Sequence, residues 1–91
     1  MNFSLLQWNI WINENPNNVV NFIKKFDADV VCLQEVSQNF KKIGNIDVPA
    51  LIKEKLNYKS EYFIAHSWDT SSGVMTQGNM ILSKFPILKH K

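Results

Sequence analysis

The sequence has few of the features that mark a disulfide-linked, strongly charged or membrane-spanning protein. Cys32 is the only cysteine, so an internal disulfide is impossible and a reducing compartment is compatible. The net charge of +2 at pH 7 is too small to indicate a nucleic-acid or membrane surface by itself. No basic segment precedes residues 3–10, and no apolar run approaches the roughly 18 residues of a membrane span. We therefore expect a cytoplasmic protein with no membrane span.

What the sequence does contain is enough apolar material for one modest core. It has 91 residues, of which 45% are hydrophobic and 20% are charged. It shows no internal repeat and no low-complexity segment. One domain, or part of one, is the upper limit, and the oligomeric state is left open.

The most informative stretch is the apolar run from Val30 to Leu33, which is followed by Glu35. Because the run does not alternate between polar and apolar residues, it predicts a strand that is covered on both faces. An unpaired carboxylate at the end of such a strand is costly, and a metal ion would be a suitable partner. The alternative is a glutamate that only marks where the strand leaves the core. This stretch alone leaves both interpretations open.

A strand, a helix and a second strand are predicted in the first part of the chain. Residues 3–10 alternate as a strand, which puts Asn9 on the face opposite Trp8. Asn15 is expected to cap a helix that begins at Pro16. The buried stripe of this helix is expected at Val19, Phe22, Ile23 and Phe26.

This order of elements connects Asn9 to Glu35. A right-handed crossover would make strands 3–10 and 30–35 parallel, and the two residues then lie at the carboxyl ends of their strands. Ligands of open α/β sheets collect at that edge. If the strands are neighbours, the two side chains converge.

The second half of the chain predicts a loop, a helix and an antiparallel pair of strands. Residues 37–47 are polar and are expected to form the loop. A helix is expected to start at Asp47 or Val48, with Pro49 in its first turn and Asn57 at its end. Its buried stripe is expected at Val48, Leu51, Ile52 and Leu56. Residues 60–66 and 79–85 read as strands joined by the polar loop 67–73. Pro86 interrupts the last strand, and residues 87–88 resemble the start of another element.

Three segments resemble, in order, motifs of the endonuclease/exonuclease/phosphatase family, the DNase I-like phosphohydrolases. They are residues 6–10 (Leu-Gln-Trp-Asn-Ile), 29–36 (Asp-Val-Val-Cys-Leu-Gln-Glu-Val) and 78–87 (Gly-Asn-Met-Ile-Leu-Ser-Lys-Phe-Pro-Ile). The resemblance implies an α/β fold, the amino-terminal part of a four-layer α/β sandwich with a mixed sheet and flanking helices. Residues 1–91 would then be the first part of a single domain that is truncated after Lys91.

The resemblance also implies a function. Members hydrolyse phosphate esters with Mg²⁺ or Mn²⁺, and their substrates range from DNA and RNA to phospholipid head groups and small phosphodiesters. Glu35 matches the metal-binding glutamate of the family, and Asn9 matches the asparagine that helps to hold the metal and the phosphate. We therefore expect a metal-dependent phosphohydrolase with Asn9 and Glu35 as its catalytic and metal-binding residues, acting by in-line attack of water.

The sequence departs from the family pattern in two respects. In the repair-nuclease branch an aspartate stands two residues after the asparagine, whereas here that position is Trp11. The catalytic histidine, the Asp-x-Asn pair and the terminal Asp-His of the family have no counterpart in these 91 residues, so the fragment is expected to be inactive alone. A non-catalytic binding relative is the alternative. A doubly wound nucleotide-binding module is disfavoured, because residues 11–15 contain no glycine for its phosphate-binding turn.

Four other residues have competing interpretations. Trp11 can either stack on a base or sugar or serve a structural role, and the sequence does not decide. For His66 a solvated strand end is favoured over contact with substrate, and for Asn79 bonding to neighbouring backbone is favoured over catalysis. For Asp29, which precedes the strand 30–35, a role in a turn or at a helix end is favoured over metal binding.

Overall fold

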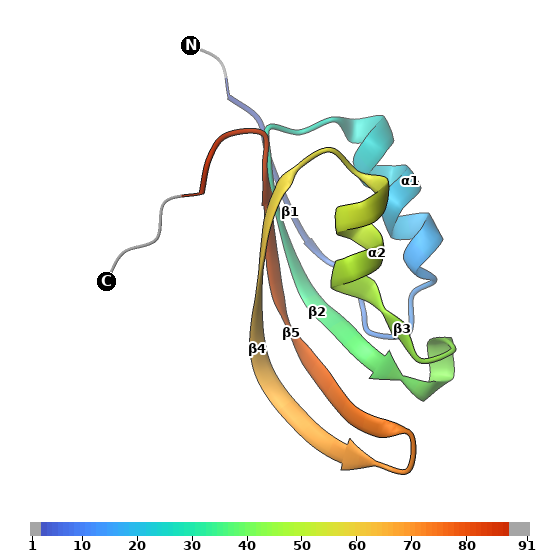
Figure 1. Ribbon diagram of the computed structural model, residues 1–91. Coiled ribbons are helices and arrows are strands. Elements are labelled where there is room, and N and C mark those ends of the chain that lie inside the picture. Colours follow the sequence, from blue (N-terminus) through green and yellow to red (C-terminus); the bar gives the residue numbers. More distant parts are fainter. Residues whose placement is uncertain (1–2, 88–91) are drawn as a thin grey trace.

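The computed structural model describes residues 3–87, which form one mixed sheet with two helices on one of its faces (Figure 1). In chain order the elements are β1 (Leu5–Asn9), α1 (Pro16–Phe26), β2 (Val30–Phe40), the short 3₁₀ helix η1 (Lys41–Ile43), β3 (Ile46–Asp47), α2 (Val48–Lys55), β4 (Lys59–Thr70) and β5 (Gly73–Ser83). The sheet has five strands in the order β1-β2-β5-β4, and β3 pairs with β2 outside this path.

The predicted parallel pair is confirmed. β1 runs parallel to β2, with Leu5 opposite Val30 and Asn9 opposite Gln34, and α1 forms the crossover between them. β5 is antiparallel to both β2 and β4. The carboxyl half of β4 therefore lies at the same end of the sheet as the carboxyl ends of β1 and β2.

Both helices start as their sequences predict. The Asn15 side chain accepts a hydrogen bond from the Asn17 amide at 2.9 Å, with Pro16 at the first position of α1. The Asp47 carboxylate caps α2 by accepting from the Ala50 amide at 3.1 Å. In each case a short polar side chain satisfies a backbone amide that the helix itself leaves unpaired.

The buried stripe of α1 differs from the expected one. Val19 and Ile23 are fully buried, but Phe22 and Phe26 are 43% and 51% exposed, and Val20 is buried instead. The Phe22 ring contacts Trp8 of β1, with ring centroids 4.7 Å apart. Since β1 is an edge strand, α1 has little sheet beneath its outer side, and Phe22 covers Trp8 at that margin.

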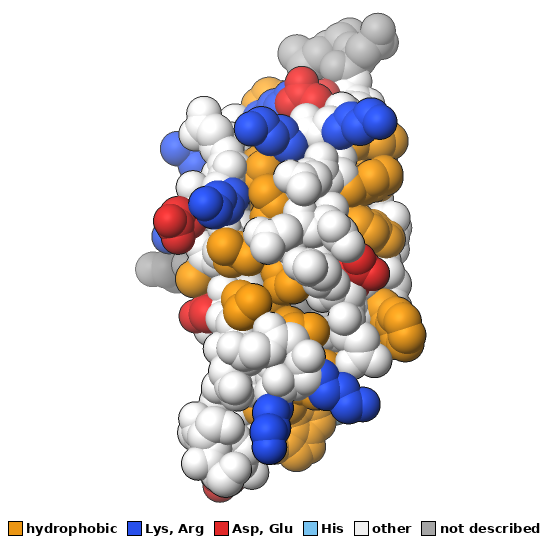
Figure 2. All heavy atoms as spheres, turned by 90° about the vertical axis from the view of Figure 1, so that its right-hand side faces the viewer, with side chains coloured by type: hydrophobic (Ala, Val, Ile, Leu, Met, Phe, Trp, Pro, Cys, Tyr) orange, Lys and Arg blue, Asp and Glu red, His pale blue; other side chains and the backbone are white. Residues whose placement is uncertain are grey.

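The core fills the space between the two helices and one face of the sheet. The sheet contributes the buried side chains of Val31, Leu33, Met80 and Leu82, and the helices contribute those of Val19, Ile23, Val48 and Ile52. Burying an aliphatic side chain of this size stabilises the fold by about 1.5–3 kcal/mol. The lysines of the helices stay on the outer surface, where Figure 2 shows basic side chains spread along the molecule among acidic and uncharged ones.

Two predicted loops are in fact strand. β2 continues from Glu35 to Phe40, and only residues 41–45 between β2 and β3 form the expected turn. β4 and β5 extend to Thr70 and Gly73, so the hairpin turn is only residues 71–72. The two extensions support each other, because the Asn39 side chain of β2 donates to the Ser72 and Val74 carbonyl oxygens at 3.1 and 3.3 Å. β5 ends at Ser83, ahead of Pro86, and Leu88 of the expected next element lies outside the described residues.

The face of the sheet away from the helices has no covering layer within residues 3–87. Phe3, Leu5 and Phe63 are between 49% and 59% exposed, while Val30 and Cys32 are half-buried. The expectation that this strand is covered on both faces therefore holds on one face only in the described part of the chain. Neither described helix is long and apolar enough to cross a membrane.

Candidate metal and phosphate site

Asn9 and Glu35 lie at one rim of the sheet, which we call the carboxyl rim because β1 ends there. Asn9 is the last residue of β1 and lies opposite Gln34, the residue immediately before Glu35. The pairing extends one residue further, since the Ile10 amide donates to the Gln34 carbonyl oxygen at 3.2 Å. Adjacent strands are about 4.8 Å apart, so the two residues are close neighbours across the strand pair.

Glu35 occupies an irregularity in β2 that the sequence did not predict. Leu33 lies opposite Met80 and Val36 lies opposite Gly78, so Gln34 and Glu35 share the single partner Asn79. The backbone of Glu35 is left-handed, with φ of 60°. This conformation costs a residue other than glycine roughly 1–2 kcal/mol. The bulge explains why the strand continues past an acid that was expected to end it.

The loop after β1 holds both side chains through backbone amides. The Trp11 amide donates to Asn9 Oδ1 at 3.0 Å, and the Ile12 amide donates to Glu35 Oε1 at 3.4 Å. Within residues 3–87, Asn9 Nδ2 and Glu35 Oε2 have no hydrogen-bond partner. Each side chain is thus oriented through one atom and keeps its second polar atom available.

The donor set of this rim fits a hard cation in an open site. Among the residues that the structure describes, no group of three or more His, Cys, Asp or Glu side chains gathers closely enough to enclose a metal. A closed zinc site, which needs four nitrogen or sulfur ligands, is therefore not formed there. Mg²⁺ is commonly held by one or two carboxylates together with waters and substrate phosphate oxygens. A single oriented carboxylate beside an amide matches that requirement.

Asn79 lies opposite the bulge, and its environment differs from the expected one. Its side chain is exposed and makes no hydrogen bond within the described range, so it does not satisfy neighbouring backbone groups. His66 is exposed on β4 and stacks on Trp68 with ring centroids 5.8 Å apart. Trp8 is half-buried against the core.

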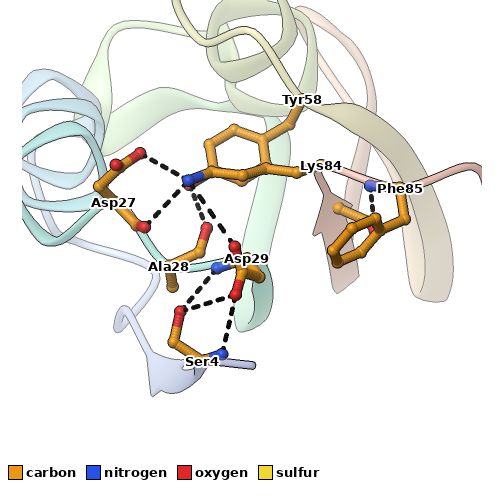
Figure 3. A network of polar contacts seen from close by, with 8 residues as sticks. Ser4, Asp27, Ala28, Asp29, Tyr58, Lys84 and Phe85 are labelled. Carbon is orange, nitrogen blue, oxygen red and sulfur yellow. Dashed lines mark hydrogen bonds and ion pairs between the residues drawn. The ribbon is translucent and has the colours of Figure 1, made fainter. Parts of the chain in front are cut away.

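Asp29 lies at the opposite end of the sheet, the amino rim, as part of the polar network in Figure 3. Its Oδ2 accepts from the amide and the hydroxyl of Ser4 at 3.0 and 3.3 Å, and its own amide donates to Ser4 Oγ at 3.0 Å. Lys84 pairs with Asp27 at 2.9 Å, and the Tyr58 hydroxyl donates to the Ala28 carbonyl oxygen at 2.6 Å. Asp29 therefore joins the start of β2 to the residue before β1, and its side chain does not stabilise the turn or helix end that was expected of it.

The sequence reasoning missed the two backbone amides that orient the site. Residue type gives no signal for them, because any residue other than proline at positions 11 and 12 carries the same N–H. Their direction is set by the turn after β1, in which Trp11 has φ of 62° and the Glu14 amide donates to the Trp11 carbonyl oxygen at 2.9 Å.

A mixed sheet with helices on one face is an α/β arrangement, and it matches a fold of the DNase I-like class. Residues 6–91 match the sequence model of the Endonuclease/Exonuclease/phosphatase family, and the chain belongs to this family. The name of the family covers endonucleases, exonucleases and phosphatases.

A solved structure has the same fold. The crystal structure of an endonuclease/exonuclease/phosphatase from Beutenbergia cavernae DSM 12333 is similar with a TM-score of 0.73 and 21% sequence identity. The match covers 97% of this chain and 27% of that one, so the chain spans about a quarter of the length of that structure. A comparison with curated proteins found no match.

Proposed function

We propose that this chain forms one side of the active site of a Mg²⁺- or Mn²⁺-dependent phosphohydrolase, with Glu35 as the metal ligand and Asn9 as its partner at the phosphate. The observation that carries the proposal is that Asn9 lies across the β1–β2 pair from Gln34, the residue next to Glu35, and that a backbone amide orients each of the two side chains. The unpaired atoms, Glu35 Oε2 and Asn9 Nδ2, are an anionic oxygen and a neutral donor. Those are the groups that a cation and a phosphoryl oxygen require.

The two side chains have different roles in this proposal. Glu35 supplies a fixed negative charge for the cation, and the bond from Ile12 keeps the carboxylate in one orientation before substrate arrives. The bound ion would polarise the phosphoryl oxygen and stabilise the leaving oxygen. Asn9 Nδ2 donates to a phosphoryl oxygen and, being neutral, adds no repulsion toward a substrate that is itself an anion. The group that activates water would come from other parts of the full-length protein.

The test is Glu35→Gln in the full-length protein. The substituted amide keeps an oxygen that can accept from the Ile12 amide, so the fold should be retained while the negative charge is lost. We expect Mg²⁺-dependent hydrolysis of bis-p-nitrophenyl phosphate or of DNA to fall about 1000-fold or more. Glu54→Gln is the matched control, because Glu54 is an exposed acid on α2.

Two results would count against the proposal. Hydrolysis that persists in Glu35→Gln would remove Glu35 from the mechanism. A wild-type protein that binds phosphodiesters and hydrolyses none of them would indicate the non-catalytic relative.

A further inference from the structure

The backbone of Trp11 has a conformation that its side chain does not favour. Its φ of 62° lies in the left-handed region. Glycine and asparagine adopt this region readily, whereas a bulky residue there is an outlier. The turn needs this conformation, because it directs the Trp11 and Ile12 amides at Asn9 and Glu35. The turn does not need an indole there.

The Trp11 side chain also contributes little to packing. It is 61% exposed, whereas Trp8 on the same segment is half-buried against Phe22. No ring contact joins Trp11 to another aromatic side chain in the described part of the chain. Neither local backbone preference nor burial explains a tryptophan at this position. Strained residues of this kind cluster where a ligand is bound.

We propose that Trp11 is a stacking surface for a base of a single-stranded nucleic acid whose phosphate lies at Asn9 and Glu35. The inference rests on the proposed function and narrows its substrate class to nucleic-acid strands, in preference to phospholipid head groups or small aliphatic diesters. Every base has a flat π-face, so stacking on an indole needs no particular sequence. Trp11 is two residues from Asn9, so a base attached to the bound phosphate is within its reach.

A second planar surface lies further along the same end of the sheet. His66 and Trp68 of β4 stack on each other, and Trp68 is 46% exposed. His66 lies opposite Gln77 and Trp68 lies opposite Met75 on β5. Both partners precede Asn79, so the two rings lie farther toward the carboxyl rim than Glu35 does. Planar groups on both sides of Glu35 suit several successive bases better than a single aromatic leaving group. Lys41 and Lys42, exposed in η1 just after β2, supply positive charge at this end for the backbone phosphates.

The deciding experiment measures binding of a fluorescein-labelled oligo(dT) 12-mer to the full-length protein by fluorescence anisotropy in EDTA, where hydrolysis cannot occur. Trp11→Asn is the key variant, because asparagine tolerates the left-handed backbone and so should preserve the turn. Trp11→Phe retains an aromatic ring. Phe85→Ala is the matched control, since Phe85 is 47% exposed but lies next to Lys84 at the amino rim.

We expect Trp11→Asn to raise the Kd for the oligonucleotide about tenfold with no fall in Tm, Trp11→Phe to raise it less than threefold, and Phe85→Ala to leave it unchanged. Unchanged binding by Trp11→Asn would overturn the inference. A Tm lowered by several degrees would also overturn it, because Trp11 would then be a packing residue. Loss of binding to phosphatidylserine vesicles, with oligo(dT) binding retained, would assign the indole to a lipid surface instead.

This outcome is separable from that of the proposed function. The Glu35→Gln assay reads hydrolysis and the Trp11→Asn assay reads binding without metal. An inactive wild-type protein whose oligo(dT) binding still depends on Trp11 would contradict the proposed hydrolase function and support the stacking surface. An active protein whose oligo(dT) binding does not depend on Trp11 would support the hydrolase function and contradict the stacking surface.

Discussion

The two rims of the sheet use similar polar residues in opposite ways. At the amino rim, Asp29 and Ser4 exchange three hydrogen bonds and Lys84 pairs with Asp27, so these polar side chains bind one another (Figure 3). At the carboxyl rim, Asn9 and Glu35 each accept one backbone amide and keep a second polar atom unpaired within residues 3–87. The amino rim joins elements together, whereas the carboxyl rim keeps polar atoms available.

Backbone strain shows the same contrast. Among residues 3–87, five residues other than glycine have positive φ, and four of them, Trp11, Glu35, Asn39 and Asn45, lie toward the carboxyl rim. The fifth, Asp27, ends α1 at the amino rim, where a left-handed residue is a common helix terminus. Asparagine tolerates this conformation, so the strain without a routine explanation is that of Trp11 and Glu35. The comparison predicts that substitutions at the carboxyl rim mainly change activity, and that substitutions at the amino rim mainly change stability.

After Glu35→Gln, the largest effect should come from Asn9→Ala at the carboxyl rim. If Asn9 donates to phosphate as proposed, its removal should lower kcat for phosphodiester hydrolysis by about 100-fold. Stability should change by about 1 kcal/mol, because only the bond from the Trp11 amide is lost. Asn9→Asp should also lower the rate, since it adds negative charge beside the substrate. Steady-state kinetics and urea unfolding of the same samples separate the two effects. A large loss of stability with a normal kcat would contradict the proposed difference between the rims.

A smaller effect, of the opposite kind, is expected from Asp29→Ala at the amino rim. The change removes the acceptor for two Ser4 groups and leaves Lys84 with one acid fewer, so unfolding should become easier by about 1–3 kcal/mol. Kinetic constants at a temperature well below the transition should stay within about twofold of wild type. Asp69→Ala, an exposed acid in β4, serves as the control for simple loss of charge. If Asp29→Ala kept full stability but lost activity, the amino rim would have to be assigned a functional role.

The smallest effect is a dependence of stability on alkaline pH. Burial raises the pKa of Tyr62 above its ordinary value of 10.0, and burial likewise raises the pKa of Tyr58. The hydrogen bond to Asp27 raises the pKa of Lys84 above 10.5. Each group holds its proton more tightly in the folded state, so its contribution is fully present below about pH 10 and is lost as pH rises through the folded pKa. Tm should therefore fall above pH 10, and less steeply in Tyr62→Phe; an unchanged slope in that variant would exclude Tyr62.

Local signals in the sequence predicted the elements that depend on local chemistry. The caps at Asn15 and Asp47 and the prolines after them fix both helix starts without help from the rest of the fold. The meeting of Asn9 and Glu35 followed from a single strand-helix-strand unit, because the handedness and direction of the crossover are general. Those features needed no knowledge of the later strands.

Features that depend on distant segments were not predictable in the same way. The extension of β2 beyond Glu35 needs β5 as its partner, and the polar residues from Ser37 to Asn39 carry no sign of that pairing. The left-handed backbone at Trp11 and Glu35 runs against residue preference, so propensity points away from it. Phe22 and Phe26 follow a helical period, but their burial depends on whether the sheet extends beneath that side of α1. It does not, because β1 is the edge strand.

The sheet face without helices carries a cysteine whose reactivity shows whether that face is covered. Cys32 lies opposite Ile81, out of phase with the buried Val31 and Leu33, and it is the single thiol of the sequence. Among these 91 residues, a thiol reagent can therefore react only at this surface. Slow labelling means that another layer covers the sheet there, and fast labelling means that solvent reaches it, so the reaction rate distinguishes a sealed interior from an open one without further engineering.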